Sequence, residues 1–222
     1  WTYGFAEMTK GQRAAIASSK RISNPGCYPT GAIGLIRPLV EAGLLPPDWP
    51  VTINAVSGYS GGGKAMIAEF ETGATKHNFR LYGLGLTHKH VPEIQSHGGL
   101  LTRPIFAPAV GRYAQGMLVE IPLHLSMLPS GATLGQVHQA LADHYAGERF
   151  VEVVSLADSA AMTGLDPEGL NDTNRMKLFV FGSESNGQTR LVALLDNLGK
   201  GASGAAVQNL NLALGLDEAA GL

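Results

Sequence analysis

The sequence of 222 residues contains one cysteine and few charges, and each of these shortages excludes certain classes of protein. With Cys27 as its only thiol, the chain has no internal disulfide framework, which suits a reducing cytoplasm. The 16 basic residues do not outnumber the 18 acidic ones, so there is no basic footprint for nucleic acid. Charges, glycines and prolines interrupt every apolar run, which excludes a membrane span. We therefore expect a cytoplasmic globular protein that binds neither nucleic acid nor a membrane.

The first residues lack the features of a complete N-terminus. Trp1–Phe5 carries no initiator methionine, no basic region and no signal-peptide cleavage pattern. The length still allows a substantial core, either as one large domain or as one domain with additional segments. We expect that the chain begins within a longer protein.

The hydrophobic pattern predicts short strands and helices, and several strands follow one another without an intervening helix. Direct connections of this kind favour an α+β fold with a mainly antiparallel sheet and flanking helices. The expected helices are residues 30–43, 65–71, a segment starting at 92, 133–145 and 205–214, with a short helix or loop within 6–20. The expected strands are 21–23, 51–57, 79–86, 104–110, 117–125, 150–156, 178–182 and 189–195.

Cys27 lies in the segment SNPGCYPTG, where a short strand is followed by a helix. The backbone N–H groups at a helix N-terminus stabilise a thiolate and can bind an oxyanion that forms on a carbonyl under attack. A lone cysteine is more often an inert buried residue. The position nevertheless favours a nucleophile, which the prolines hold at a fixed angle while the glycines leave room for substrate.

Two histidines in the segment THKHVPE are candidates for the proton acceptor that a thiol nucleophile needs. In an extended segment His88 and His90 point to the same face. His90 is the better candidate, because the following Val-Pro restrains its backbone. The alternatives are a structural or surface pair, or a metal site that would need a third ligand such as His97.

Residues 58–65 read GYSGGGKA, which nearly spells the phosphate loop of P-loop NTPases. Ala65 stands where that loop needs a magnesium-binding Ser or Thr, so the pattern favours only a simpler site for a phosphate or carboxylate. The candidate groups for that site are Ser57, Gly58, Ser60 and Lys64.

Residues 199–204 read GKGASG, a literal G-x-G-x-x-G between a strand and a helix. A dinucleotide fingerprint opens a βαβ unit, whereas only 18 residues follow Gly204. The segment is therefore expected to be a helix-entry turn that meets a cofactor held elsewhere. The candidate cofactor contacts are Asn197, Gly199, Lys200, Gly201 and Gly204.

Four motifs follow one another in a specific order, although none is specific alone. They are NPGCYPT at 24–30, SGYSGGGK at 57–64, HKHVPEI at 88–94 and DNLGKGASGAA at 196–206. In this order the chain resembles the N-acetyl-γ-glutamyl-phosphate reductases of arginine biosynthesis, especially their short type. The resemblance extends from Tyr3-Gly4 to the last helix.

The resemblance implies an NADP-dependent oxidoreductase related to the aspartate-semialdehyde and glyceraldehyde-phosphate dehydrogenases. A Rossmann domain would bind NADP(H), and an α+β domain like the C-terminal domain of glyceraldehyde-3-phosphate dehydrogenase would supply catalysis and the contacts of a homodimer or homotetramer. By motif, Cys27 is the nucleophile that forms a thioester with the acyl phosphate, and His90 is its acid/base partner. Hydride then gives N-acetylglutamate 5-semialdehyde.

The family's opening Gly-x-x-Gly-x-x-Gly loop and a nucleotide-binding half of about 100 residues are absent from this sequence. Ala6 also stands where the family usually has proline. We expect residues 1–26 to be the tail of that half and the lead-in to the active site, 27–196 to be the catalytic domain, and 197–222 to contain a helix that returns to the nucleotide-binding half. Alone, the chain is not expected to hold NADPH well.

Three alternatives stay open: another semialdehyde dehydrogenase of the superfamily, a cysteine hydrolase that uses the same thiol and imidazole, and a non-catalytic module. For the substrate, Asn24 and His88 are further candidate contacts. Arg103 and Arg112 are candidates for the substrate carboxylate, although such arginines are more often solvated surface charges.

Overall fold

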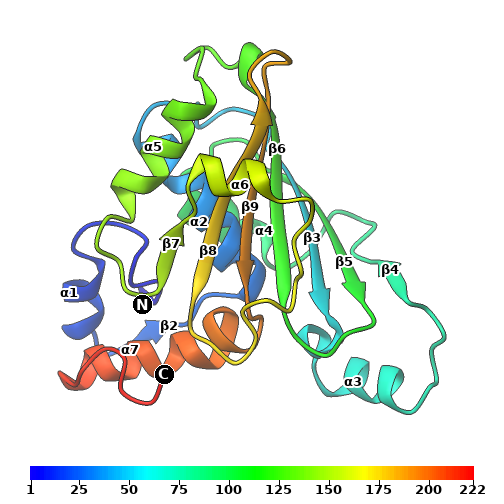
Figure 1. Ribbon diagram of the computed structural model, residues 1–222. Coiled ribbons are helices and arrows are strands. Elements are labelled where there is room, and N and C mark those ends of the chain that lie inside the picture. Colours follow the sequence, from blue (N-terminus) through cyan, green and yellow to red (C-terminus); the bar gives the residue numbers. More distant parts are fainter.

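The computed structural model describes all 222 residues and shows one large sheet with helices on its faces (Figure 1). Four of the six strand pairs in that sheet are antiparallel, so the predicted α+β fold with a mainly antiparallel sheet is confirmed. The helices are α1 (Gln12–Ala17), α2 (Cys27–Glu41), α3 (Gly63–Glu71), α4 (Val91–Gly98), α5 (Leu134–His144), α6 (Leu156–Ala161) and α7 (Gly204–Leu214), with the short 3₁₀ turns η1 (Tyr59–Gly62) and η2 (Leu125–Met127) and the π-helix η3 (Gly199–Ser203). The strands are β1 (Thr2–Tyr3), β2 (Ile22–Ser23), β3 (Thr52–Gly58), β4 (Phe79–Leu81), β5 (Ile105–Gly111), β6 (Met117–His124), β7 (Val151–Val153), β8 (Met176–Ser183) and β9 (Gln188–Leu195).

The seven strands of the large sheet lie in the order β4-β5-β3-β6-β9-β8-β7. Strands β6, β9 and β8 are antiparallel neighbours in the middle, while β3 pairs with β5 in parallel and β7 with β8 in parallel. The connection from β3 to β5 runs through η1, α3, β4 and α4, so both histidines of the motif lie on this crossover. The short strands β1 and β2 form a separate parallel pair.

Helix α2 lies across one face of the sheet and forms the centre of the core. Its Ile33, Leu35 and Ile36 are completely buried, and the alternate β6 residues Met117 and Val119 are buried beneath it. The helix approaches the sheet closely, because a Cβ at Gly31 would lie 2.8 Å from the Val119 side chain. This packing fixes the N-terminus of α2, and Cys27 with it, at the end of the sheet where β6 begins.

Pro38 lies inside α2, where it cannot donate the backbone hydrogen bond that the Gly34 carbonyl would normally accept. The Tyr145 hydroxyl, which follows α5, donates to that carbonyl at 2.9 Å instead. Tyr145 is 4% exposed, so this bond lies in the interior. The tyrosine therefore satisfies the acceptor that the proline leaves free, and the helix continues to Glu41.

The other face of the sheet is covered over only part of its area. Helix α6 and the loop after it pack on β8 and β9 through a small cluster that includes Leu170, Phe179 and Val192. Toward β4 and β5 the same face is open, and Phe79, Leu81 and Ile105 are each half exposed or more. An open apolar sheet face of this kind is typical of an interaction surface.

Several boundaries differ from the sequence-based expectations. Helix α2 begins at Cys27 rather than at residue 30, and β4 ends at Leu81 because Gly83 and Leu86 turn the chain with positive φ. The two-residue β1 and the single-turn α6 were not predicted, since elements this short carry no periodicity. Thr133 caps α5 with a capping box, which agrees with the helix expected at residues 133–145.

Candidate active site

The turn before α2 places Cys27 at the first position of the helix. Gly26 is the N-cap in an extended conformation, with φ −69° and ψ 155°, and Cys27 itself is half-buried. The Gly201 backbone of η3 lies against it, because a Cβ at Gly201 would meet the Cys27 Cβ at 2.8 Å. Glycine at 201 is thus required by the close approach of η3 to the thiol-bearing residue.

His90 lies beside the same turn, as the N-cap residue of α4. A Cβ at Gly26 would be only 2.6 Å from the His90 Nε2 atom, so the imidazole occupies the space above the peptide that precedes Cys27. The structure therefore brings the two predicted catalytic residues together. Glycine at 26 has a clear role, since it lets the imidazole approach the backbone.

The His88 ring packs edge-on against His90, with ring centroids 4.8 Å apart. Its Nδ1 accepts the His90 backbone N–H at 3.2 Å, which holds the two histidines in one orientation. Tyr28 and Phe106 close the other side of His88, and the Tyr82 hydroxyl donates to the Tyr28 hydroxyl at 2.8 Å. The two imidazoles thus lie beside the turn that carries Cys27, and His88 is enclosed by the Tyr28 and Phe106 rings.

Burial raises the pKa of the Cys27 thiol to about 11, and the Glu93 carboxylate also raises it. The backbone N–H groups of Cys27 and Tyr28 and the Lys89 ammonium lower this pKa, but by less. The expectation that the helix N-terminus makes the resting thiol anionic is therefore wrong for this structure. The physical reason is that half-buried sulfur loses more from lost hydration than it gains from the helix N–H groups.

Burial likewise lowers the pKa of His90 to about 4, and the neighbouring His88 and Lys89 charges lower it further. The pKa of His88 is lowered by burial and then by Lys89. Near pH 7 the resting site thus holds a neutral thiol beside neutral imidazoles. His90 Nδ1 is buried with no hydrogen-bond partner, so no carboxylate fixes its tautomer.

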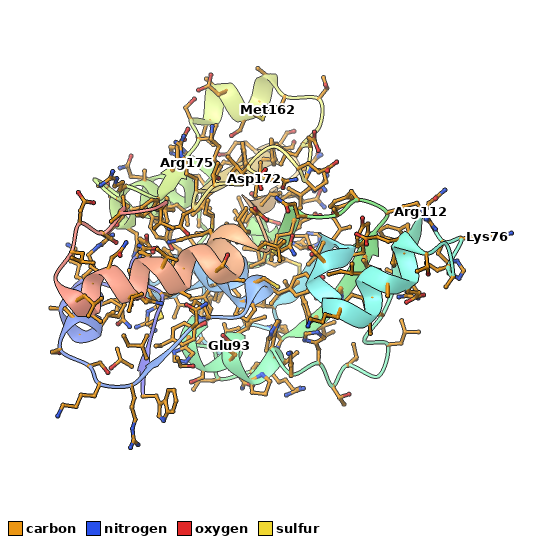
Figure 2. All side chains as sticks on the ribbon, turned by 90° about the horizontal axis from the view of Figure 1, so that it is seen from below. Lys76, Glu93, Arg112, Met162, Asp172 and Arg175 are labelled. Atoms are coloured by element: carbon orange, nitrogen blue, oxygen red, sulfur yellow. The ribbon has the colours of Figure 1, made fainter.

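Glu93 is a residue of this site that the sequence analysis did not identify. Its Oε1 accepts the Gly26 N–H at 2.9 Å and the Tyr3 hydroxyl at 2.8 Å. Because Glu93 lies in the first turn of α4, it ties the helix that begins at His90 to the turn that precedes Cys27. Figure 2 shows it on α4. The sequence signal that could have identified Glu93 is its position one helical turn after the candidate base His90.

Most of the predicted substrate-binding side chains use their polar atoms within the protein. Asn24 Nδ2 donates to the Ala202 carbonyl of η3, and the buried Ser57 hydroxyl donates to the Gly58 carbonyl. A Cβ at Gly58 would clash with the backbone at residue 114. The Ser60 hydroxyl accepts from Asn197 at 2.9 Å. These residues therefore shape the walls of the site, whereas Lys64 is exposed.

The two predicted carboxylate-binding arginines do not lie free in a cleft. Arg112 donates to the carbonyls of Thr75 and His77 and lies over the Phe70 ring, so it anchors the loop after α3. In Figure 2 it lies beside α3, far across the molecule from Glu93. Arg103 is exposed and donates to the Leu86 carbonyl at 3.2 Å. Binding of the substrate carboxylate by either arginine stays a prediction.

The predicted cofactor contacts do not present free side-chain groups to a dinucleotide. Asn197 is 2% exposed and bonds Gly116 and Ser60, while the Lys200 ammonium is buried against Glu7. The glycines face protein rather than open space, because a Cβ at each would meet one of three neighbours. Those neighbours are the Thr173 carbonyl for Gly199, Cys27 for Gly201 and the Asn174 side chain for Gly204. This side-chain set does not fit a dinucleotide site, and only the backbone of η3 borders Cys27.

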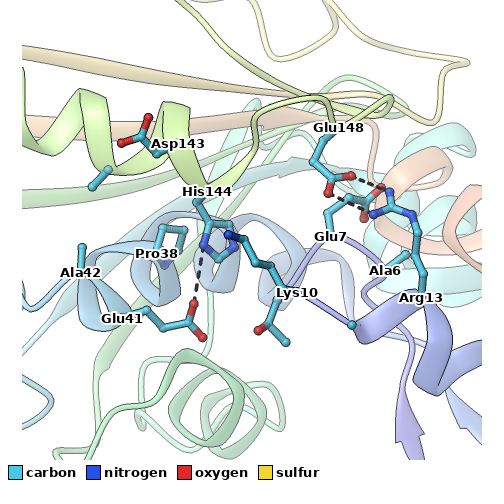
Figure 3. A pocket seen from close by; sticks show the side chains of 13 residues that line it. Ala6, Glu7, Lys10, Arg13, Pro38, Glu41, Ala42, Asp143, His144 and Glu148 are labelled. Carbon is cyan, nitrogen blue, oxygen red and sulfur yellow. Dashed lines mark hydrogen bonds and ion pairs between the residues drawn. The ribbon is translucent and has the colours of Figure 1, made fainter.

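Three further features bear on other kinds of site. His97 stacks on the Tyr3 ring at 3.6 Å between centroids, so it does not join His88 and His90, and no cluster of three or more His, Cys, Asp or Glu side chains could hold a metal ion. No helix has the length and apolar character needed to cross a bilayer. A cleft of about 570 Å³ lies between α2, α5 and residues 6–13, and it includes neither Cys27 nor His90 (Figure 3).

Comparisons with known proteins identify the family to which the chain belongs. Residues 27–197 match the family described as "Semialdehyde dehydrogenase, dimerisation domain". The chain is 60% identical over 220 residues to the N-acetyl-gamma-glutamyl-phosphate reductases of Brucella ovis and Brucella melitensis, covering 97% of this chain and 71% of each relative.

Among solved structures, the fold resembles aspartate semialdehyde dehydrogenase II from Vibrio cholerae, with a TM-score of 0.64 at 18% identity over 94% of this chain and 67% of that one. Aspartate semialdehyde dehydrogenase from Francisella tularensis also gives a TM-score of 0.64, at 14% identity over 94% of this chain and 70% of that one. At these identities the likeness concerns the fold alone. Together, the matched family and the 60% identity show that this chain belongs to the N-acetyl-gamma-glutamyl-phosphate reductase family of the semialdehyde dehydrogenases.

Proposed function

We propose that the chain forms the catalytic part of an NADPH-dependent N-acetyl-γ-glutamyl-phosphate reductase, in which Cys27 carries the acyl group as a thioester. One observation carries the proposal: the only thiol lies at the start of α2, and the His90 imidazole lies against the peptide immediately before it. A reducing cytoplasm suits a catalytic thiol, and the family's role in arginine biosynthesis is consistent with that compartment.

In the first step the Cys27 sulfur attacks the acyl carbon of the substrate. His90, neutral and with a pKa of about 4 at rest, takes the thiol proton, and the forming negative charge nearby stabilises the imidazolium. The carbon–oxygen bond to phosphate then breaks, so that phosphate leaves and a thioester remains. Since an acyl phosphate already has a good leaving group, the protein mainly has to position the thiol and stabilise charge.

The oxyanion that forms on the attacked carbonyl lies at the N-terminus of α2. The backbone N–H groups of Cys27 and Tyr28 already interact with the sulfur, and they point toward the position where charge develops. The neutral resting state of the thiol is compatible with this sequence, because proton transfer to His90 accompanies the attack. Lys89 is exposed, and its charge acts on both Cys27 and His90, so it adds positive potential at the site entrance.

For the second step we propose NADP(H), which supplies the hydride that reduces the thioester when it is bound. The residues of this chain contribute the Gly201 backbone beside the sulfur rather than a dinucleotide site. We also retain the proposed division of the chain, in which residues 1–26 lead into the site, 27–196 form the catalytic domain and 197–222 pack on the nucleotide-binding part.

The acylation step can be tested on the 222-residue chain without any cofactor. After incubation with N-acetyl-γ-glutamyl phosphate, intact-mass spectrometry should show one added acyl group on Cys27, with release of phosphate. Cys27→Ser should abolish the adduct, and His90→Ala should slow its formation by about 10²–10⁴-fold, the usual contribution of a positioned acid or base. Phosphate release by Cys27→Ser at the wild-type rate would contradict the thioester. Complete phosphate release that depends on Cys27 and leaves it unmodified would instead show that water resolves the thioester, as in the cysteine hydrolase.

For the oligomer, we propose that a second copy of the chain covers the open sheet face near β4 and β5. The matched family is described as a dimerisation domain, and Leu81 and Ile105 on this face are 59% and 50% exposed. Sedimentation should give a dimer or larger for the wild type and a smaller species for Ile105→Arg. A charged change on the polar side of α5, Gln139→Arg, is the matched control and should leave the oligomer unchanged. A monomeric wild type at tens of micromolar would refute this part.

A further inference from the structure

A buried ion pair joins η3 to the segment that precedes α1. The Lys200 side chain is 2% exposed and the Glu7 side chain 0% exposed, and Lys200 Nζ lies 2.8 Å and 2.9 Å from the two Glu7 carboxylate oxygens. Gln208 accepts a third bond from the same ammonium and donates to Glu7, so the two charges have satisfied partners. The rings of Phe5 and Phe150 lie 5.8 Å and 5.4 Å from the ammonium.

Such a pair is a costly way to stabilise a fold. Removing two charges from water usually offsets most of their attraction, and an apolar pair of similar size often stabilises a core at least as well. Burial alone would raise the pKa of Glu7, yet the nearby Lys200 ammonium and its hydrogen bonds bring that pKa below its ordinary value. Glu7 is therefore ionised at neutral pH, and the value of the pair lies in fixing where the two segments sit rather than in added stability.

The segment that Lys200 fixes is the one that touches the reactive thiol. Gly201, the next residue, packs against Cys27 so closely that an added Cβ would lie 2.8 Å from the Cys27 Cβ. The following carbonyl, of Ala202, accepts a hydrogen bond from Asn24, three residues before the cysteine. One side of η3 thus contacts the catalytic turn, while its lysine points to the opposite side and is held by Glu7.

We propose that Lys200 and Glu7 are positioning residues, whose ion pair holds η3 against Cys27 and so sets the exposure and reactivity of the thiol. This inference deepens the proposed function and rests on Cys27 as its nucleophile. It also gives the lead-in segment a direct connection to the site, because Glu7 belongs to residues 1–26. Arg13 and Glu148 extend the network to the cleft of Figure 3.

The test measures the rate at which iodoacetamide alkylates the single thiol of the 222-residue chain between pH 7 and 9.5. When η3 is released, Cys27 becomes better hydrated and its raised pKa falls. Each unit of decrease raises the thiolate fraction ten-fold and lowers its nucleophilicity, for a net gain of about three-fold in rate at pH 8. The charges of Glu93 and Lys89 also act on this thiol, and they stay unchanged in every variant.

Four variants separate positioning from stability. Lys200→Met leaves Glu7 buried and unpaired, so it should lower the melting temperature and speed alkylation at least three-fold. The double variant Glu7→Gln with Lys200→Met removes both charges, so it should recover most of the melting temperature and still alkylate faster. Arg190→Gln, which removes an exposed ion pair with Glu120, and Leu123→Ala, at the far end of β6, serve as controls for charge and for stability.

A double variant that alkylates at the wild-type rate, with a wild-type pH profile, would overturn the proposal and leave the ion pair a purely structural role. The same holds if Leu123→Ala accelerates alkylation as much as Lys200→Met. Acylation of Cys27 by the acyl phosphate is measured separately, so failure of the proposed function leaves this result readable. Conversely, wild-type alkylation rates in the variants would refute the positioning role and would leave the proposed thioester on Cys27 uncontradicted.

Discussion

The most informative single measurement is the pH titration of Cys27, because the chain has no other thiol to obscure the result. The structure places the pKa at about 11, chiefly through burial, whereas a free thiol titrates near 8.5. At pH 8 the thiolate fraction is then about 0.1%, against about 25% for a free thiol. A more basic thiolate is also more nucleophilic, by about ten-fold over this range, so alkylation should be about 20-fold slower than for a small thiol.

The assay is iodoacetamide labelling followed by intact mass, with the same chain in concentrated urea as the fully exposed reference. The alkylation rate of the folded chain should still be rising at pH 9.5. The rate of the unfolded chain should level off at a pH at least about one unit lower than that of the folded chain. Because the folded thiol keeps its proton to a higher pH than the unfolded one, its contribution to stability is complete below the free thiol's pKa of about 8.5 and is lost as the pH rises through about 11. A folded midpoint below pH 9 would refute the assignment of burial as the dominant effect.

Substitutions at three positions test other contacts of the fold and the site. Tyr145→Phe leaves the Gly34 carbonyl without a donor in the interior, so urea titration should show a loss of about 1–3 kcal/mol in the free energy of unfolding; an unchanged midpoint would contradict the role given to this hydroxyl. Gly26→Ala puts a Cβ 2.6 Å from His90 Nε2 and should reduce acylation of the thiol at least about ten-fold with unchanged far-ultraviolet circular dichroism. Glu93→Ala removes the acceptor of the Gly26 N–H and should slow acylation, and Glu93→Gln, which keeps an oxygen there, should recover it; equal rates for the two would count against the link between α4 and the thiol turn.

The elements that the sequence predicted are those with a local physical cause. Strand β3 alternates half-buried and buried residues over its first six positions, and the β8–β9 hairpin turns at Gly187 with a φ of 61°. The helix cap at Thr133 follows from the reach of a short side chain to a nearby N–H. In each case the residues that decide the structure lie within a few positions of one another.

The parts that could not be predicted depend on residues far apart in the chain. The parallel pairing of β3 with β5 follows from a crossover of more than forty residues, and no local pattern specifies it. The Gly26–Glu93 bond and the Lys200–Glu7 ion pair join positions 67 and 193 residues apart. A glycine in a motif signals a close approach, but only the fold shows which group approaches.

The same reasoning explains why candidate ligands became parts of the wall. Asn24 and Asn197 are candidate ligands because they belong to the motifs, yet a site that buries part of its thiol must also satisfy the backbone groups it buries with it. Their amides bond the η3 carbonyl at 202 and the N–H of Gly116, which only polar side chains at those positions can reach. Some motif residues around a nucleophile therefore take part in the chemistry and others hold the surrounding backbone in place, and here the second group is larger.

The groups left to meet an anionic substrate are the exposed cations Lys64 and Lys89 and the N–H groups at the start of α2. Substrate affinity should accordingly fall steeply with added salt, since exposed charges are screened over about 10 Å at 0.1 M, while the rate of acylation at saturating substrate should change little.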